Sequence, residues 1–385
     1  MNAMKIIKHH LLFCVVLSII VIFSAYQPYA KTTGGDVFRV AYLEGDPYVN
    51  YAGNLNGIIF GLSQLGLVDD TSDWGFHEGS DDAYLIWDWL ENHTHNEISF
   101  VRDEFYQLIF MSDLEKTEFV RHMNEDDEID LILVMGTSAS KFIRENNINT
   151  DVMIMSVTNA HEAGIVNGLD YSGIKNVWAH VSQNRYYNQL NVFYDLFQFN
   201  RLGIVYENSE NGRNEIAYAD IKRFAESKDI DLVEVPVDAN IQTDRPEEYE
   251  KKMIEGYHML SEKTDAVYMT NCGGRTADRI LEYLDPLYQK GIPAFSQTGK
   301  NDVKNGAVMT IYRYNFDEIG NFCAQQFVSI MEGKSPGQLE QGYDESQALC
   351  FNIEAAEKAG LKLPFKALVS ADTIFTAIGE NNQDE

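Results

Sequence analysis

Short apolar runs alternate with amphipathic stretches along most of the chain. The runs Ile129–Met135, Val152–Ser156 and Ala266–Met269 contain almost no polar residues, which is typical of buried parallel strands. Stretches with helical spacing lie between such runs, for example Asp113–Met123 and Tyr249–Leu260. Strands that alternate with helices of about 10–15 residues predict βαβ units and parallel sheets.

One strand-and-loop unit occurs twice. Asp130–Ser140 is an acid, an apolar run and a loop of small or polar residues that opens a helical segment, and Asp265–Arg275 repeats this arrangement. Open α/β sheets bind ligands at the carboxyl ends of their strands. The two copies therefore predict two α/β lobes, each with a ligand loop, and a cleft between them.

The N-terminus has the pattern of a secretory signal peptide in residues 1–30. Lys5 and Lys8 precede an apolar run, Leu11–Phe23, and small residues follow it. The run is shorter than the roughly 20 apolar residues that a transmembrane helix needs. We expect a cleaved signal and a periplasmic protein, with a retained N-terminal anchor as the alternative.

Composition narrows the classes of partner. A formal net charge of −29 argues against nucleic acid and anionic membranes. Hydrophobic residues make up 45% of the chain, too many for a disordered acidic protein. Three cysteines follow the signal, and Cys323 and Cys350 lie in apolar patterns that indicate core thiols rather than a disulfide framework.

Catalytic and metal-binding motifs are missing from the sequence. It has no Gly-x-Ser-x-Gly elbow, no phosphate-binding P-loop and no His-Glu-x-x-His helix. Cys272 has no neighbouring histidine to act as a base. His93 and His95 form a candidate metal pair, but a solvated loop is the simpler interpretation. We therefore expect no cofactor, no metal and no enzyme activity.

A series of motifs in a fixed order gives a resemblance to a known family. They include Asp130–Ser138, Met155–Val166, Arg201–Glu210, Lys290–Ser296 and Phe351–Leu361. From about residue 128 to 375 the chain resembles the ABC-transporter substrate-binding proteins of the tryptophan/tyrosine-binding type. The resemblance implies a type I periplasmic-binding-protein fold, an α/β architecture of two Rossmann-like lobes with parallel sheets joined by hinge strands.

This resemblance also implies a domain organisation. The N-terminal lobe would comprise residues 37–180 and about 308–345, with an insertion at 68–95 that holds a loop and a short helix. The C-terminal lobe would comprise residues 181–307 and about 346–378. The hinges are expected near Val177–Asn184, Gln297–Ala307 and Asp344–Leu349.

The implied function is solute binding for an ABC importer. A small organic ligand would bind in the cleft and pass to an ABC permease in the inner membrane; the protein would be a monomer and bind no nucleic acid. The ligand candidates are an aromatic or carboxylic acid and an amino-acid-like compound. The alternative is a sensing module that signals to a membrane receptor or kinase, since such modules reuse this fold.

Family positions place the ligand contacts in loops of both lobes. The expected residues are Tyr48, Thr137, Ser138, Thr158, Asn159, Arg185, Asn208, Arg213, Asn271, Cys272, Arg275, Phe295 and Ser296. Thr137 and Ser138 open a helix whose N-terminus suits an anion, although either side chain could instead cap that helix. The alternative for each arginine is a solvated or salt-bridged position on the surface. The alternative for each aromatic residue is packing in the core.

Two departures from the family bear on the ligand. Asn159 and Cys272 stand where amino-acid-binding members usually have an aspartate, and Arg185, Arg213 and Arg275 stand where uncharged residues are usual. Arginine suits carboxylates and phosphates, so these changes favour an anionic or amine-free ligand. The opposite possibility stays open, because Glu44, Asp46 or Glu207 could restore the missing negative charge.

Overall fold

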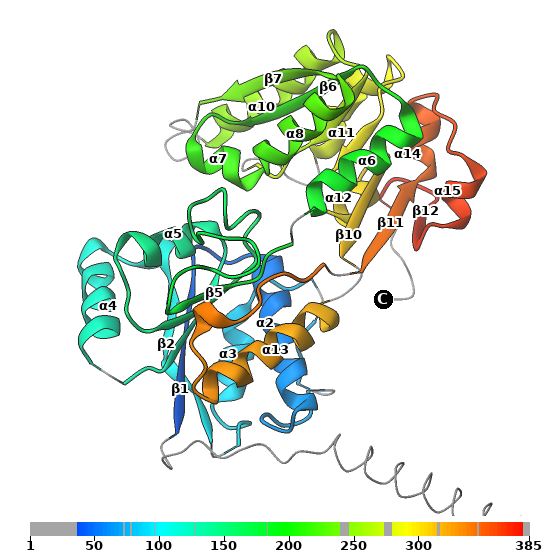
Figure 1. The fold of residues 1–385 in the computed structure, drawn as a ribbon. Coiled ribbons are helices and arrows are strands. Elements are labelled where there is room, and N and C mark those ends of the chain that lie inside the picture. Colours follow the sequence, from blue (N-terminus) through cyan, green and yellow to red (C-terminus); the bar gives the residue numbers. More distant parts are fainter. Residues whose placement is uncertain are drawn as a thin grey trace, which may run out of the picture.

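The computed structural model describes residues 37–379, with the exception of residues 72–73, 78, 96, 127, 183, 239–245, 273–278, 314–315 and 345. This part of the chain forms two α/β lobes (Figure 1). Lobe 1 is built on a five-stranded sheet and lobe 2 on a seven-stranded sheet. The expected signal peptide lies outside the described residues.

The sheet of lobe 1 is entirely parallel, in the order β2-β1-β3-β4-β5. Its strands are β1 (Phe38–Glu44), β2 (Ile98–Gln107), β3 (Leu131–Met135), β4 (Asp151–Met155) and β5 (Val177–Ala179). Leu131 and Leu133 of β3 face one hydrophobic core, whereas Ile132 and Val134 face the other. Burial on both faces explains why the central strands are apolar runs without alternation.

Helices cover both faces of this sheet. α2 (Val49–Gln64), α3 (Ala83–Leu90) and α13 (Asp317–Met331) contribute to one core, and α4 (Asp113–Glu125) and α5 (Thr137–Glu145) contribute to the other. The helix α3 is the short helix expected in the insertion. Its Trp87 is fully buried, so this segment belongs to the core of lobe 1.

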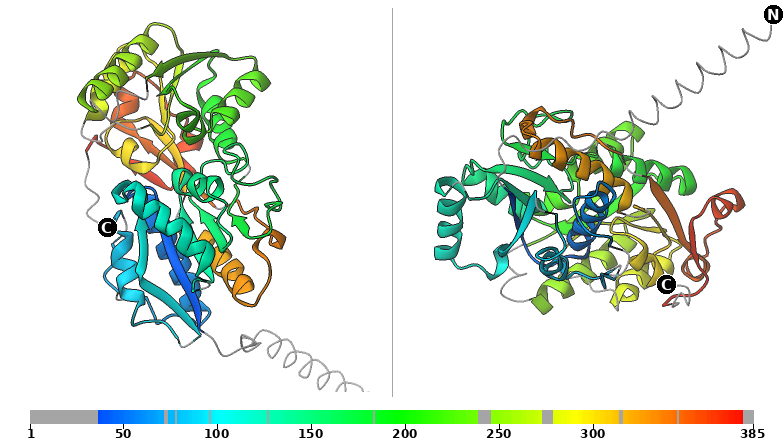
Figure 2. Two further views of the ribbon diagram at one scale, coloured as in Figure 1. Left: turned by 90° about the vertical axis from the view of Figure 1, so that its left-hand side faces the viewer. Right: turned by 90° about the horizontal axis from the view of Figure 1, so that it is seen from below.

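Glycines allow α2 and α13 to pack very closely. Gly53, Gly57 and Gly61 lie on one face of α2, since residues four apart share a helix face. A Cβ atom at Gly320 of α13 would lie 2.1 Å from the Gly57 carbonyl oxygen. This contact holds a segment from late in the chain against the first helix of lobe 1 (Figures 1 and 2).

The sheet of lobe 2 has the order β12-β11-β10-β9-β8-β6-β7 and is parallel except between β10 and β11. Its strands are β6 (Arg201–Glu207), β7 (Asp231–Val237), β8 (Ala266–Met269), β9 (Ala294–Ser296), β10 (Met309–Arg313), β11 (Gln347–Asn352) and β12 (Thr373–Phe375). Its helices include α6 (Arg185–Phe197), α7 (Glu210–Glu215), α8 (Tyr218–Lys228), α10 (Pro246–Ser261), α11 (Ile280–Tyr288), α12 (Lys300–Lys304), α14 (Ile353–Lys358) and α15 (Phe365–Val369).

Two expected boundaries between the lobes are wrong. The strand β10 was expected in the N-terminal lobe, but it pairs with β9 and β11 in the sheet of lobe 2. The expected hinge at Gln297–Ala307 connects two strands of that same sheet and contains α12, so it does not cross between lobes. The chain instead returns to lobe 1 between β10 and α13. An apolar run identifies a strand but not its pairing partner.

Candidate functional site

Two loops meet at the carboxyl edge of the lobe 1 sheet. The strands β1 and β3 are paired through Glu44 and Met135, so the segments that follow them are neighbours. Gly136 has a φ of 85°, and a Cβ atom there would lie 2.0 Å from the Tyr51 hydroxyl oxygen. Glycine is therefore required at this position by both its backbone and its surroundings.

The helix α5 begins at this edge with Thr137 and Ser138 in its first turn. No side chain of the described residues caps that turn, so neither hydroxyl plays the capping role that was the alternative to ligand contact. Thr137 is buried, while Ser138 is exposed. The first amides of a helix and its dipole favour an anion.

Glu44 is a fully buried carboxylate at the end of β1. The Tyr42 hydroxyl donates to its Oε2 at 2.6 Å, and Gln107 Nε2 donates to its Oε1 at 2.6 Å. Burial raises the pKa of Glu44 to about 7, the two hydrogen bonds oppose the rise, and the charge of Asp46 adds to it. Both carboxylate oxygens thus accept hydrogen bonds from neutral donors. Neither of the two groups that lower the pKa of Glu44 is a cation.

The facing edge of lobe 2 carries a second carboxylate, that of the half-buried Glu215, at the end of α7. Burial raises the pKa of Glu215 to about 7, and the charges of Glu207 and Asp46 raise it further. A hydrogen bond from Asn211 and the charge of Lys141 oppose the rise. Asp46 and Lys141 belong to lobe 1, so carboxylates of both lobes share one region.

Direct contacts join the two lobes in this region. The Thr158 hydroxyl donates to the Glu215 carbonyl oxygen at 3.2 Å, and Lys141 Nζ lies 3.5 Å from Glu210 Oε1. Figure 1 shows α5 of lobe 1 opposite α7 of lobe 2. We call this region, defined by Glu44, Asp46, Thr158, Glu207 and Glu215, the interlobe region.

The loop after β8 is attached to this region through a buried glutamine. Gln297 Oε1 accepts from the Asn271 backbone N–H at 2.6 Å, and its Nε2 donates to the Ile216 carbonyl at 2.8 Å. The Cys272 thiol packs on backbone, with Sγ 3.6 Å from the Thr270 carbonyl oxygen. Arg275 lies outside the described residues.

Other expected contacts have local partners. Tyr48 precedes α2, and its ring centroid lies 5.1 Å from that of Tyr51. Asn159 Oδ1 accepts from the Glu162 N–H at 3.1 Å, which closes a turn. Asn208 is exposed beside Arg213, whose Nη1 is 3.5 Å from Asn208 Oδ1.

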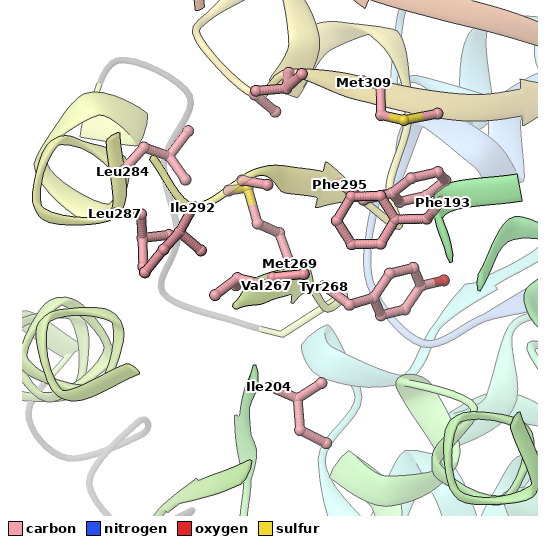
Figure 3. Packing of buried hydrophobic residues seen from close by; sticks show 14 of the residues in the cluster. Phe193, Ile204, Val267, Tyr268, Met269, Leu284, Leu287, Ile292, Phe295 and Met309 are labelled. Carbon is pink, nitrogen blue, oxygen red and sulfur yellow. The ribbon is translucent and has the colours of Figure 1, made fainter. Parts of the chain in front are cut away.

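Three expected residues lie in other parts of lobe 2. Arg185 is the first residue of α6, with its guanidinium 5.5 Å from the Tyr186 ring. The Phe295 ring is fully buried and packs 5.4 Å from the rings of Phe193 and Tyr268 (Figure 3). The Ser296 hydroxyl donates to Asp302 at 2.6 Å. The packing of Phe295 and Ser296 is that of core and turn residues, so we leave both out of the proposed site.

A known protein family matches parts of both lobes of this chain. The profile of the family described as ABC transporter substrate binding protein matches residues 106–375. The chain belongs to this family. The family binds solutes and is not a family of enzymes. No curated protein matches the chain.

Solved structures agree with the fold of an ABC transporter substrate-binding protein. A conserved domain protein from Vibrio cholerae is 19% identical with a TM-score of 0.61, and the match covers 88% of this chain and all of that one. A Streptococcus domain in complex with L-Trp is 14% identical with a TM-score of 0.60 and the same coverage. A ligand-free, open substrate-binding protein with adhesive properties from Clostridium difficile is 17% identical with a TM-score of 0.59, covering 89% of this chain and all of that one.

Sequence reasoning missed part of the interlobe region. Glu215 was not expected there, and Glu207 was only an open alternative, whereas Glu44 and Asp46 lie in a loop, Glu44–Tyr48, that was expected to contact the ligand. The described residues include no group of three or more histidine, cysteine or acidic side chains arranged for a metal ion. Among the helices that the structure describes, none has the length and apolar character needed to cross a bilayer.

Proposed function

We propose that this protein is the extracytoplasmic binding component of an ABC importer and holds a small organic ligand between its lobes. The family membership supports a transport role, and the carboxyl ends of parallel strands, which both sheets contain, are where α/β proteins bind ligands. The observation that carries the proposal is the contact between Thr158 and Glu215, which joins these edges across the lobes. The protein would be exported to the periplasm by its signal peptide, act as a monomer and deliver its ligand to a membrane permease.

Charge favours an amino-acid-like ligand among the candidates. Glu44, Asp46, Glu207 and Glu215 supply negative charge in the interlobe region, whereas Lys141 is the cation that opposes the raised pKa of Glu215. A ligand that is only an acid would add to this repulsion. A ligand ammonium near Glu44 and Asp46 would relieve it, and the ligand carboxylate would bind at the start of α5. Tyr48 would contact the remainder of the ligand.

Ligand screening tests this proposal. We expect free amino acids or close analogues to raise the melting temperature as RT ln(1 + [L]/Kd), and aromatic acids and dicarboxylates to have no effect. Cells in which the gene is deleted should no longer take up the same compound. A shift with acids only would contradict the ligand class, and unchanged uptake would contradict the import role.

A matched pair of variants tests the ligand carboxylate at α5. Ser138→Asp places a negative charge in the first helical turn, where it stabilises the helix but repels a bound carboxylate. Ser138→Asn has nearly the same shape and no charge. We expect the aspartate variant to bind at least about tenfold more weakly than the asparagine variant, by calorimetry, without loss of stability. Equal affinities would place the ligand carboxylate elsewhere.

A further inference from the structure

A tyrosine hydroxyl in lobe 2 is buried without a hydrogen-bond partner among the described residues. It belongs to Tyr249, in the first turns of α10, whose side chain has no exposed surface. Burial raises the pKa of this hydroxyl, and the neighbouring Cys272, Glu207 and Glu215 raise it further. Because a buried polar group without a partner is unfavourable, this hydroxyl points to a partner that the described residues do not supply.

The carboxylates beside this hydroxyl have neutral partners. The Glu207 Oε1 atom accepts from the Ser209 hydroxyl at 2.6 Å, and the Glu215 Oε1 atom accepts from Asn211 Nδ2 at 2.7 Å. Lys141 is the nearby cation that affects Glu215, and its ammonium lies 3.5 Å from a different carboxylate, that of Glu210. Among the described residues, the carboxylates of Glu207, Glu210 and Glu215 therefore outnumber the cations Lys141 and Arg213.

The chemistry of an ammonium group matches this combination. An ammonium has three N–H donors and no acceptor, so it suits two carboxylates and a phenol oxygen. An additional negative group would raise the repulsion, and an apolar group would leave the Tyr249 hydroxyl without a partner.

We propose that Glu207, Glu215 and the Tyr249 hydroxyl bind a second cationic group of the ligand, so that the transported solute is a basic amino-acid-like compound. This inference rests on the proposed function, in which lobe 1 binds the ligand's carboxylate and first ammonium. The second cation then reaches lobe 2. A ligand that is cationic at both ends also brings the carboxylates of the two lobes together, which favours closure around it.

Pairs of amino acids that differ only in the terminal ammonium test the inference. Lysine and norleucine form one pair, and ornithine and norvaline form another. By calorimetry at pH 7.5 we expect the basic member of a pair to bind at least about tenfold more tightly, because a hydrogen-bonded charge contributes more than an apolar end. Equal affinities within both pairs would overturn the second cation site but leave the proposed function intact. If neither pair nor any other amino acid binds, the proposed function itself fails.

Variants locate the site. Glu215→Gln should weaken lysine by about tenfold or more and leave norleucine within about twofold. Glu226→Gln, an exposed position on α8, makes the same change in net charge and should alter neither affinity. Tyr249→Phe should weaken lysine by about threefold to tenfold without lowering the melting temperature, because phenylalanine fills the same space. The assignment would be overturned if Glu215→Gln lowered the affinity for lysine and norleucine equally. It would also be overturned if Glu226→Gln lowered the affinity for lysine as much as Glu215→Gln does.

Discussion

Replacing Glu44 by glutamine should change how the stability of lobe 1 depends on pH. The carboxyl is fully buried, and its pKa rises from 4.5 to about 7, chiefly through burial. Glutamine has the same shape and still serves both neighbours, because its oxygen accepts from Gln107 and its amide donates to the Tyr42 hydroxyl. The substitution thus removes the ionisation and keeps the packing.

The magnitude follows from proton linkage. Because the folded state has the higher pKa, it binds more protons than the unfolded state between pH 4.5 and about 7. The wild-type protein therefore loses stability as pH rises through this interval. The Glu44→Gln variant has no carboxyl at this position, so its unfolding free energy lacks this pH dependence. Between pH 5 and pH 8 we expect the variant to gain about 2–3 kcal/mol relative to wild type, at 1.36 kcal/mol for each tenfold change.

Tryptophan fluorescence gives an assay specific to lobe 1. All four tryptophans, Trp74, Trp87, Trp89 and Trp178, lie in this lobe. Urea unfolding followed by their emission at pH 5, 6, 7 and 8 yields the free-energy difference at each pH. Glu118→Gln, an exposed position on α4, is the control. A difference that stays constant within about 0.5 kcal/mol, or that changes in the opposite direction, would refute the argument.

Three further substitutions test the packing around the lobes. Gly320→Ala should destabilise lobe 1 by about 1–3 kcal/mol in the same urea assay, because its Cβ would meet the Gly57 carbonyl; unchanged stability would show that α2 and α13 can separate. Gly136→Ala should cost a similar amount and weaken ligand binding, since Tyr51 must move; wild-type affinity would contradict this. Gln297→Leu should destabilise lobe 2 by about 2–3 kcal/mol, because the Asn271 N–H and the Ile216 carbonyl lose their partners. Urea unfolding monitored by far-ultraviolet circular dichroism measures this change. An unchanged urea midpoint would mean that water replaces the glutamine.

The two-lobed fold was predictable because its strands are buried on both faces. Ala266–Met269 was predicted with the bounds observed, and the run Ile129–Met135 contains β3. A strand of this kind needs no knowledge of its neighbours to be recognised. The pairing of β10 was not predictable, since an apolar strand fits the sheet of either lobe. The helix α6 was not assigned at all.

Side-chain roles in the candidate site were harder to predict than its loops. The family position of Phe295 implied a ligand contact, but its ring packs against Phe193 and Tyr268 in the core of lobe 2. Glu215 gave no signal, because it lies in a six-residue polar helix that looks like a solvated turn. Its environment depends on residues of lobe 1 that are distant in sequence, and a local pattern contains no such information.

The two strand-and-loop units differ in the surroundings of their loops. The first leads into α5, whose first turn has no side-chain cap among the described residues and suits an anion. In the second unit, Asp265–Arg275, the described part ends at Cys272, whose thiol packs on backbone, while the carboxylates of lobe 2 come from β6 and α7. The missing aspartates at Asn159 and Cys272 led the sequence interpretation toward an anionic ligand. The negative charge is present at other positions instead, namely at Glu44, Asp46, Glu207 and Glu215, so the loss of an acid from a loop does not by itself predict a loss of cation binding.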